Sequence, residues 1–180
     1  LTSYFLFLIG KLFYSTNVGI ISAILYFVSP FFFFSGGLLI VPDGPLNFFV
    51  VSSLYFVSKI IFNKKNGLLV EWLFIGVLMA LAFLSKYQAY FFGLSLIIYF
   101  IFWKKEILVS KKFLISFIIA LIGLLPVIIW NFNNDFSSFL FHQERSSFNF
   151  HPDRFVLLFL VQLFLILPSS AILIFLSFYY

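Results

Sequence analysis

The sequence predicts an all-α polytopic membrane protein, and three observations lead to this fold class. Of the 180 residues, 63% are hydrophobic and 9% are charged, whereas a soluble domain has about 25% charged residues. The apolar residues form runs of about 20, which is the length that a helix needs to cross a hydrocarbon core of roughly 30 Å. The basic residues gather between alternate runs, as they do when loops alternate across a membrane.

About six spans are expected along the chain, since each needs about 20 apolar residues. Residues 1–15 have the pattern of the end of an earlier span. Residues 18–40 form the next, with Pro30 as a tolerated kink. The segment Pro42-Asp43-Gly44-Pro45 should end it, because two prolines and a glycine cannot continue a helix. The return span is expected over residues 45–62.

The apolar run over residues 68–103 is too long for one crossing. As a single helix it would measure roughly 52 Å, more than a tilted helix needs. It also carries the polar segment Ser85-Lys86-Tyr87-Gln88 at its middle. Two spans over residues 69–85 and 87–103 are therefore predicted. The last two spans are expected over residues 113–130, with Pro126 near the far end, and 155–178.

This arrangement distributes the basic residues unevenly, and the positive-inside rule then fixes the orientation. One side holds Lys11, Lys59, Lys64, Lys65, Lys104, Lys105, Lys111 and Lys112. The other side holds Lys86, Arg145 and Arg154. The lysine-rich side is therefore expected to be cytoplasmic, and the other side extracytoplasmic. These lysine flanks also account for the net charge of +5, so nucleic acid is not expected as a partner. The chain has no cysteine, which excludes disulfides and thiol chemistry within it.

Two charged residues on the extracytoplasmic side are candidates for a site. Asp43 lies in a short turn between two spans, where it could be an ordinary turn former, or a general base or metal ligand close to the membrane boundary. Lys86 would cost about 2.5–3.5 kcal/mol near the bilayer centre, so it should have a partner or a task. It could reach the interface by snorkelling, or it could bind a phosphate oxygen.

A third candidate group lies in the polar segment after residue 130. The stretch Asn131-Phe132-Asn133-Asn134-Asp135-Phe136 is consistent with a plain hydrated loop. His142 and Glu144 could contact a divalent metal ion or the acceptor, and Arg145 suits phosphate recognition. The sequence has no zinc-type spacing, glycine-rich phosphate loop or Ser-His-Asp arrangement.

Three segments of the chain resemble signatures of bacterial lipid-phosphate-sugar glycosyltransferases. Val41-Pro42-Asp43-Gly44-Pro45-Leu46 resembles Thr-Pro-Asp-Ala-Pro-Leu, with glycine in place of alanine. Ala80-Leu81-Ala82-Phe83-Leu84-Ser85-Lys86-Tyr87 is similar to Gly-Leu-Ala-Leu-Leu-Ser-Lys-Tyr. Leu125-Pro126-Val127-Ile128-Ile129-Trp130-Asn131 is similar to Leu-Pro-Val-Leu-Ile-Trp-Asn. Taken in order, they resemble the dolichyl-phosphate-mannose–protein mannosyltransferase-like superfamily, which includes the aminoarabinose transferases, over roughly residues 10–150.

The resemblance implies a C-type glycosyltransferase helix bundle in a bacterial inner membrane. Such an enzyme moves a sugar from a polyprenyl-phosphate carrier to a lipid, glycan or protein acceptor on the extracytoplasmic face. On this reading Asp43 is catalytic, Lys86 and Arg145 bind the donor phosphate, and a divalent metal is a possible cofactor. The family's best-known catalytic carboxylate lies in a first loop that would precede Leu1. The 180 residues are therefore expected to be a piece of a longer protein.

Two other functions are alternatives to the transferase. A transporter or flippase of a lipid-linked sugar would use the same bundle and the same cations without breaking a bond. Transporters often contain repeated pairs of broken helices, and this sequence shows one broken hairpin, at Lys86. A membrane scaffold is the third function, but a scaffold has no reason to place unpaired charges at Asp43 and Lys86.

Overall fold

Every element of secondary structure is a helix in the computed structural model, which describes residues 1–34, 39, 41–62, 67–145 and 152–166. The helices are α1 (Thr2–Phe13), α2 (Thr16–Val28), α3 (Pro30–Phe33), α4 (Asp43–Phe62), α5 (Leu69–Ser85), α6 (Ala89–Trp103), α7 (Lys105–Leu108), α8 (Lys111–Ile122), α9 (Leu125–Asn133), α10 (Ser137–Arg145) and α11 (Pro152–Ile166).

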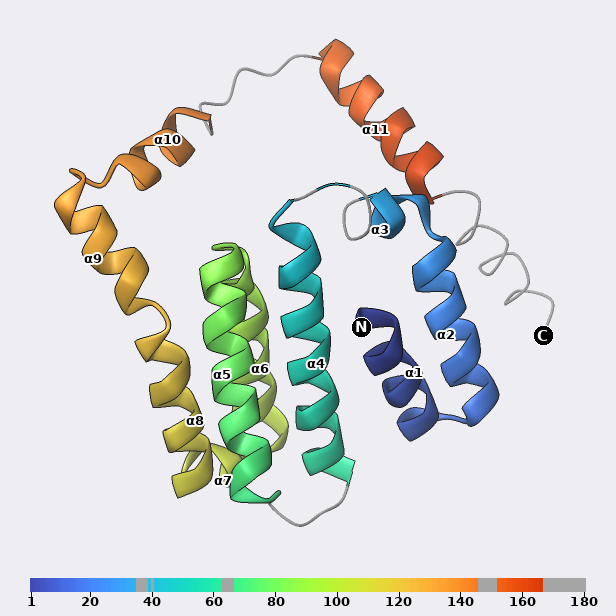
Figure 1. Cartoon of the computed structure of the whole chain (residues 1–180), viewed down its shortest axis with the longest axis vertical. Coiled ribbons are helices and arrows are strands. Elements are labelled where there is room, and N and C mark those ends of the chain that lie inside the picture. Colours follow the sequence, from blue (N-terminus) through green and yellow to red (C-terminus); the bar gives the residue numbers. More distant parts are fainter. Residues whose placement is uncertain (35–38, 40, 63–66, 146–151, 167–180) are drawn as a thin grey trace.

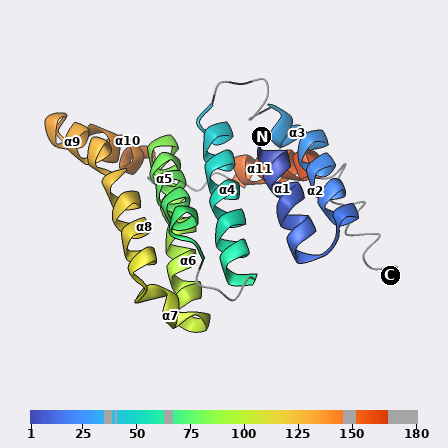
Figure 2. The same ribbon diagram turned by 60° about the horizontal axis from the view of Figure 1, so that its bottom comes forward.

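The longer helices lie side by side in a slab (Figure 1). Its order is α2, α1, α4, α5, α8, and each helix contacts the next. Helix α6 packs against α5 and α4 from behind, as the turned view in Figure 2 makes clear. The short α7 connects α6 to α8 at the lower end of Figure 1, while α9 and α10 extend from the upper end of α8. The chain alternates direction, so α4 and α5 are antiparallel.

The long apolar run over residues 68–103 forms two helices. Helix α5 ends at Ser85, and Lys86 leaves the helical conformation with φ −162° and ψ 138°. Helix α6 starts three residues later, at Ala89. The break falls at the polar segment where the sequence analysis divides the run. The number of membrane crossings stays a prediction.

The helix that precedes the Asp43 segment ends earlier than the span predicted over residues 18–40. Helix α2 stops at Val28, and the short α3 begins at Pro30, so this proline ends a helix where a kink was expected. Ser29 has ψ 121°, because the ring of a following proline disfavours the helical region for the residue before it. Residues 35–38 and 40 of the predicted span lie outside the described residues.

The Pro42–Pro45 segment starts a helix instead of only ending one. Helix α4 begins at Asp43, so Asp43, Gly44 and Pro45 form its first turn. Proline is compatible with this position because the first N–H groups of a helix have no partner within it. Asp43 is therefore a residue of a helix N-terminus, which the sequence analysis did not predict.

The segment predicted as one span over residues 113–130 contains α8 and α9, separated at Gly123 and Leu124. Pro126 lies in the first turn of α9 and cannot donate the hydrogen bond that would continue α8. The last predicted span, over residues 155–178, begins with α11, and residues 167–178 lie outside the described part of the chain.

The distribution of side chains indicates that lipid surrounds the slab. In the part of the chain that the structure describes, the helical segments Asp43–Phe62 and Lys111–Asn133 are long and apolar enough to cross a membrane. Large apolar side chains face outward, as in Phe27 and Ile118, which are 65% and 56% exposed. Serines are buried instead: Ser52 and Ser53 are both 0% exposed. Their hydroxyls donate to the backbone carbonyls of Phe48 and Val50 at 2.6 and 2.8 Å. A soluble protein has the opposite distribution.

Small residues bring the helix backbones together, as is usual between membrane helices. A Cβ atom on Gly10 in α1 would lie 2.8 Å from Cα of Gly19 in α2. A Cβ on Gly76 in α5 would lie 2.7 Å from the carbonyl oxygen of Ser116 in α8. These contacts fix the separations of α1 from α2 and of α5 from α8.

The close contact at Gly76 can be tested by adding one methyl group. Gly76→Ala should destabilise the full-length protein by about 1–3 kcal/mol, the usual effect of overpacking, since the methyl would press on the α8 backbone. Thermal unfolding in detergent measures this loss. Gly93→Ala is the control, because its Cβ would approach the flexible end of Met79 at 3.3 Å. Equal unfolding temperatures for the two variants would contradict the proposed role of Gly76.

Candidate functional site

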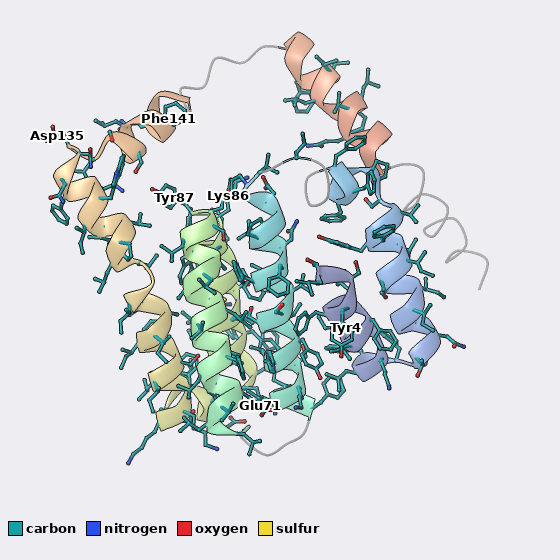
Figure 3. All side chains as sticks on the ribbon, viewed as in Figure 1. Tyr4, Glu71, Lys86, Tyr87, Asp135 and Phe141 are labelled. Carbon is teal, nitrogen blue, oxygen red and sulfur yellow. The ribbon has the colours of Figure 1, made fainter. Side chains whose placement is uncertain are left out.

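Asp43 and Lys86, which the sequence analysis selected separately, form an ion pair. The Lys86 Nζ donates to the Asp43 Oδ1 at 2.7 Å, although 43 residues separate them along the chain. Both side chains are partly exposed, Lys86 to 33% and Asp43 to 32%. Figure 3 shows Lys86 at the upper end of α5, beside the start of α4. Lys86 therefore has a partner, one of the two alternatives that the sequence left open.

The local structure places each charge where the helix dipole favours it. Asp43 lies in the first turn of α4, and Lys86 is the residue that follows the last turn of α5. Carboxylates are stabilised at helix N-termini and ammonium groups at C-termini. Because α4 and α5 are antiparallel neighbours, these two ends meet. The pair thus has a structural explanation before any functional one.

A second ion pair joins the same two helices at their opposite ends. Lys59 Nζ lies 2.8 Å from Glu71 Oε1, and the other carboxylate oxygen of Glu71 accepts a hydrogen bond from the Leu68 backbone N–H at 2.9 Å. No pairing of Glu71 with Lys59 was predicted from the sequence. The pair could have been inferred from the predicted hairpin, because charges near the ends of two adjacent antiparallel helices come together.

The charged groups separate between the two ends of the slab. Lysine-bearing segments, the ends of α1 and α4 and the residues around α7, lie at the lower end, where Figure 3 also labels Glu71. Asp43, Lys86 and Asp135 lie at the upper end. The segregation is a property of the structure. Which end faces the cytoplasm stays a prediction, and Lys64 and Lys65 lie outside the described residues.

Lys86 lines a cavity of about 600 Å³ between the α5–α6 turn and α9. Its lining is mainly apolar and aromatic: Phe83, Lys86, Tyr87, Gln88, Tyr90, Phe91, Leu124, Val127 and Ile128. A second cavity of about 320 Å³ lies deeper, among α4, α5, α6 and α8. Phe83, Tyr90 and Leu124 line both cavities, so the two are adjacent. A ligand whose polar group binds Lys86 could therefore place an apolar part in the adjoining cavities.

A second polar contact lies beside Lys86 and was missed by the sequence analysis. The Tyr87 hydroxyl is 3.0 Å from Ser138 Oγ, which itself donates to Oδ1 of Asn131. Asn131 is 1% exposed. This contact joins the segment Ser85–Gln88 to the first turn of α10. Tyr87 and Asn131 belong to quoted motifs, but nothing in the sequence indicated that Ser138 would connect them.

The remaining predicted site residues lie on the chain after the α9–α10 turn. His142, Glu144 and Arg145 belong to α10, and their side chains lie outside the described part of the structure. Asp135 lies in the turn before α10 with φ 49°, and Phe136 follows with φ 54°. Both are in the left-handed region that non-glycine residues rarely adopt. Their roles stay predictions.

The described residues at Asp43 do not favour a metal ion at this carboxylate. Among the side chains that the structure describes, no group of three or more His, Asp or Glu residues gathers. The Lys86 ammonium already lies against Asp43 at 2.7 Å, and its positive charge would repel a second cation there. What the arrangement offers chemically is a cation and a carboxylate in contact, at the rim of an apolar cavity.

Comparison with known proteins identifies a family. A family model described as dolichyl-phosphate-mannose-protein mannosyltransferase matches residues 1–130. No curated protein and no solved structure matches the chain. The matched range contains both members of the ion pair and helices α1 to α8.

The Asp43–Lys86 contact predicts a measurable energetic coupling. Asp43→Asn, Lys86→Gln and the double variant form a cycle in which the coupling should be about 0.2–1 kcal/mol, as for other partly exposed pairs. The unfolding temperature of the detergent-solubilised protein is the readout, and the coupling should shrink as salt is added. Strictly additive effects of the two single changes would mean that the pair does not form in solution.

Proposed function

Since the chain belongs to the dolichyl-phosphate-mannose-protein mannosyltransferase family of membrane glycosyltransferases, we propose that it transfers a sugar from a polyprenyl-phosphate carrier to an acceptor outside the cytoplasm. The acceptor class would be a lipid, a glycan or a protein. The membrane would be the bacterial inner membrane, with the lysine-rich end of the slab in the cytoplasm. The fold would be part of a C-type glycosyltransferase bundle.

The observation that carries this proposal is the Asp43–Lys86 pair at the rim of a mainly apolar cavity. A polyprenyl-phosphate sugar has an anionic phosphate between a long apolar chain and a polar sugar. Such a molecule needs a cation at the membrane boundary with apolar space beside it. The adjoining cavities of about 600 and 320 Å³ supply that space next to Lys86.

Lys86 would bind and stabilise the departing phosphate. A lysine ammonium has three N–H donors, and the bond to Asp43 uses one of them. When the bond between the anomeric carbon and the phosphate oxygen breaks, negative charge grows on the phosphate. A fixed cation at that position stabilises the transition state more than the ground state. Arg145 would support the same phosphate from α10.

Asp43 would assist on the acceptor side of an inverting transfer. The acceptor oxygen attacks the anomeric carbon while the carbon–phosphate-oxygen bond breaks, and the acceptor proton passes to a carboxylate base. The resemblance assigns that base to a carboxylate other than Asp43, so Asp43 would orient the acceptor hydroxyl and hold the Lys86 ammonium in place. A divalent metal remains a proposal for His142 and Glu144, and no step here passes through it.

Transfer in proteoliposomes tests the function and the role of Asp43 together. The full-length protein receives a radiolabelled polyprenyl-phosphate sugar and a crude envelope acceptor, and label should move to the acceptor. Asp43→Asn should slow the transfer by about 10- to 100-fold, because it weakens hydrogen bonds that a charged group makes to the acceptor and to Lys86. Glu106→Gln is the control, since it neutralises an exposed carboxylate that also pairs with a lysine, Lys104, at the opposite end of the slab.

Two outcomes would contradict this proposal. Label that crosses the bilayer while still attached to its carrier would identify a flippase. An Asp43→Asn protein that transfers at the unmodified rate would remove Asp43 from the site.

The two lysines of the α4–α5 ion pairs allow a matched test of phosphate binding. Lys86→Ala should raise the KM for the donor and also lower kcat, so that kcat/KM falls by about 10- to 100-fold, as expected for the loss of a hydrogen bond to a charged group. Lys59→Ala also breaks an ion pair between α4 and α5, but at the opposite end, and should leave that KM unchanged. Steady-state transfer at varied donor concentration is the measurement. Equal effects of the two changes would show that only helix pairing is lost.

A further inference from the structure

The cavity at Lys86 has one wall that stands apart from the rest of the slab. Helix α8 packs against α5, but above the break at Gly123 and Leu124 its continuation, α9, leans away, as Figure 1 shows. The space between α9 and the α5–α6 turn is the cavity of about 600 Å³. Its width therefore depends on what holds α9 in place above the break.

A directed chain of hydrogen bonds connects the two walls. Ser138 Oγ donates to Asn131 Oδ1, and a serine hydroxyl has a single proton. The hydroxyl of Tyr87, 3.0 Å from the same Oγ, must therefore be the donor in that contact. The direction runs from Tyr87 to Ser138 to Asn131. The Asn131 side-chain N–H₂ continues it by donating to the Val127 carbonyl oxygen at 2.9 Å.

Asn131 is suited to anchor this chain. Its side chain is bonded on both the oxygen and the nitrogen, and the residue is 1% exposed. The backbone carbonyl oxygen of Asn131 also accepts hydrogen bonds from the backbone N–H groups of Asn134 at 3.2 Å and Phe136 at 2.9 Å. These bonds close the turn in which Asp135 and Phe136 have positive φ. The turn directs the chain back so that Ser138 reaches Tyr87.

We propose that Tyr87, Ser138 and Asn131 are positioning residues that set the width of the Lys86 cavity and the place of Lys86 within it. The inference rests on the proposed function for its consequence, which is donor binding. Tyr87 follows Lys86 directly, and both line the cavity. Fixing Tyr87 to α10 therefore fixes the position of Lys86 relative to α9. None of the three residues takes part in bond making or breaking.

Positioning predicts a specific kinetic result. Tyr87→Phe and Ser138→Ala each remove one hydroxyl from the chain of bonds, and each should raise the donor KM by about 5-fold while kcat changes by less than about 2-fold. The double variant should be no worse than either single one, because the first change already breaks the link. Ser138→Thr keeps a hydroxyl and should retain the original KM. Tyr99→Phe, in the far part of α6 where Tyr99 stacks on Trp103, is the control.

A second readout does not depend on sugar transfer. The 180 residues contain no cysteine, so Leu84→Cys and Asn133→Cys can carry spin labels in a cysteine-free full-length protein; both positions are exposed. The label–label distance distribution between α5 and α9 should be narrow and should broaden with Tyr87→Phe. An unchanged distribution would overturn the proposal, and so would additive effects on the donor KM. Absence of transfer in the unmodified protein would contradict the proposed function. The label–label distances would still show whether the hydrogen bonds of Tyr87, Ser138 and Asn131 hold α9 in its position.

Discussion

The rest of the structure depends on the antiparallel packing of α4 against α5, a hairpin that has an ion pair at each end. Asp43 binds Lys86 at 2.7 Å at one end, and Lys59 binds Glu71 at 2.8 Å at the other. Between Asp43 and Lys59 the helix rises about 24 Å, somewhat less than the roughly 30 Å hydrocarbon core of a bilayer. Flexible lysine side chains can extend beyond that length toward the headgroups. The hairpin is thus apolar along its length and charged at its ends.

The other helices take their places from this hairpin. Helix α8 approaches the α5 backbone at Gly76, α6 covers α4 and α5 from one side, and α1 packs on α4 and carries α2 with it through Gly10 and Gly19. The contacts of α8 with α5 and of α2 with α1 involve glycines, which suit a lipid surrounding that gives no hydrophobic drive for helices to associate. The site lies at the upper end of the hairpin because the antiparallel geometry brings a helix N-terminus and a helix C-terminus together there.

The sequence predicted those residues that are unfavourable in their own segment, such as a charge within an apolar run. It did not predict residues whose role depends on a partner far away in the chain. Lys86 was selected because a charge within an apolar run is energetically unfavourable unless it has a partner or a function. The same residue marked the break between α5 and α6. Asp43 was selected from its place between apolar runs, but its position inside the first turn of α4 depends on how Pro42 and Pro45 are accommodated. The effect of Pro30 was underestimated, since Ser29 leaves the helical region. Ser138 could not be found, because its contact with Tyr87 depends on two left-handed residues in an intervening turn.

The two ion pairs also have a consequence for how the chain enters the membrane during synthesis. Each charged residue of α4 has its partner on α5, the next helix to emerge from the ribosome. The penalty for taking these charges out of water is therefore offset within one hairpin, without help from helices made later. Such a hairpin can leave the translocon as a neutralised unit, and α6 and α8 then assemble on a scaffold that is already embedded.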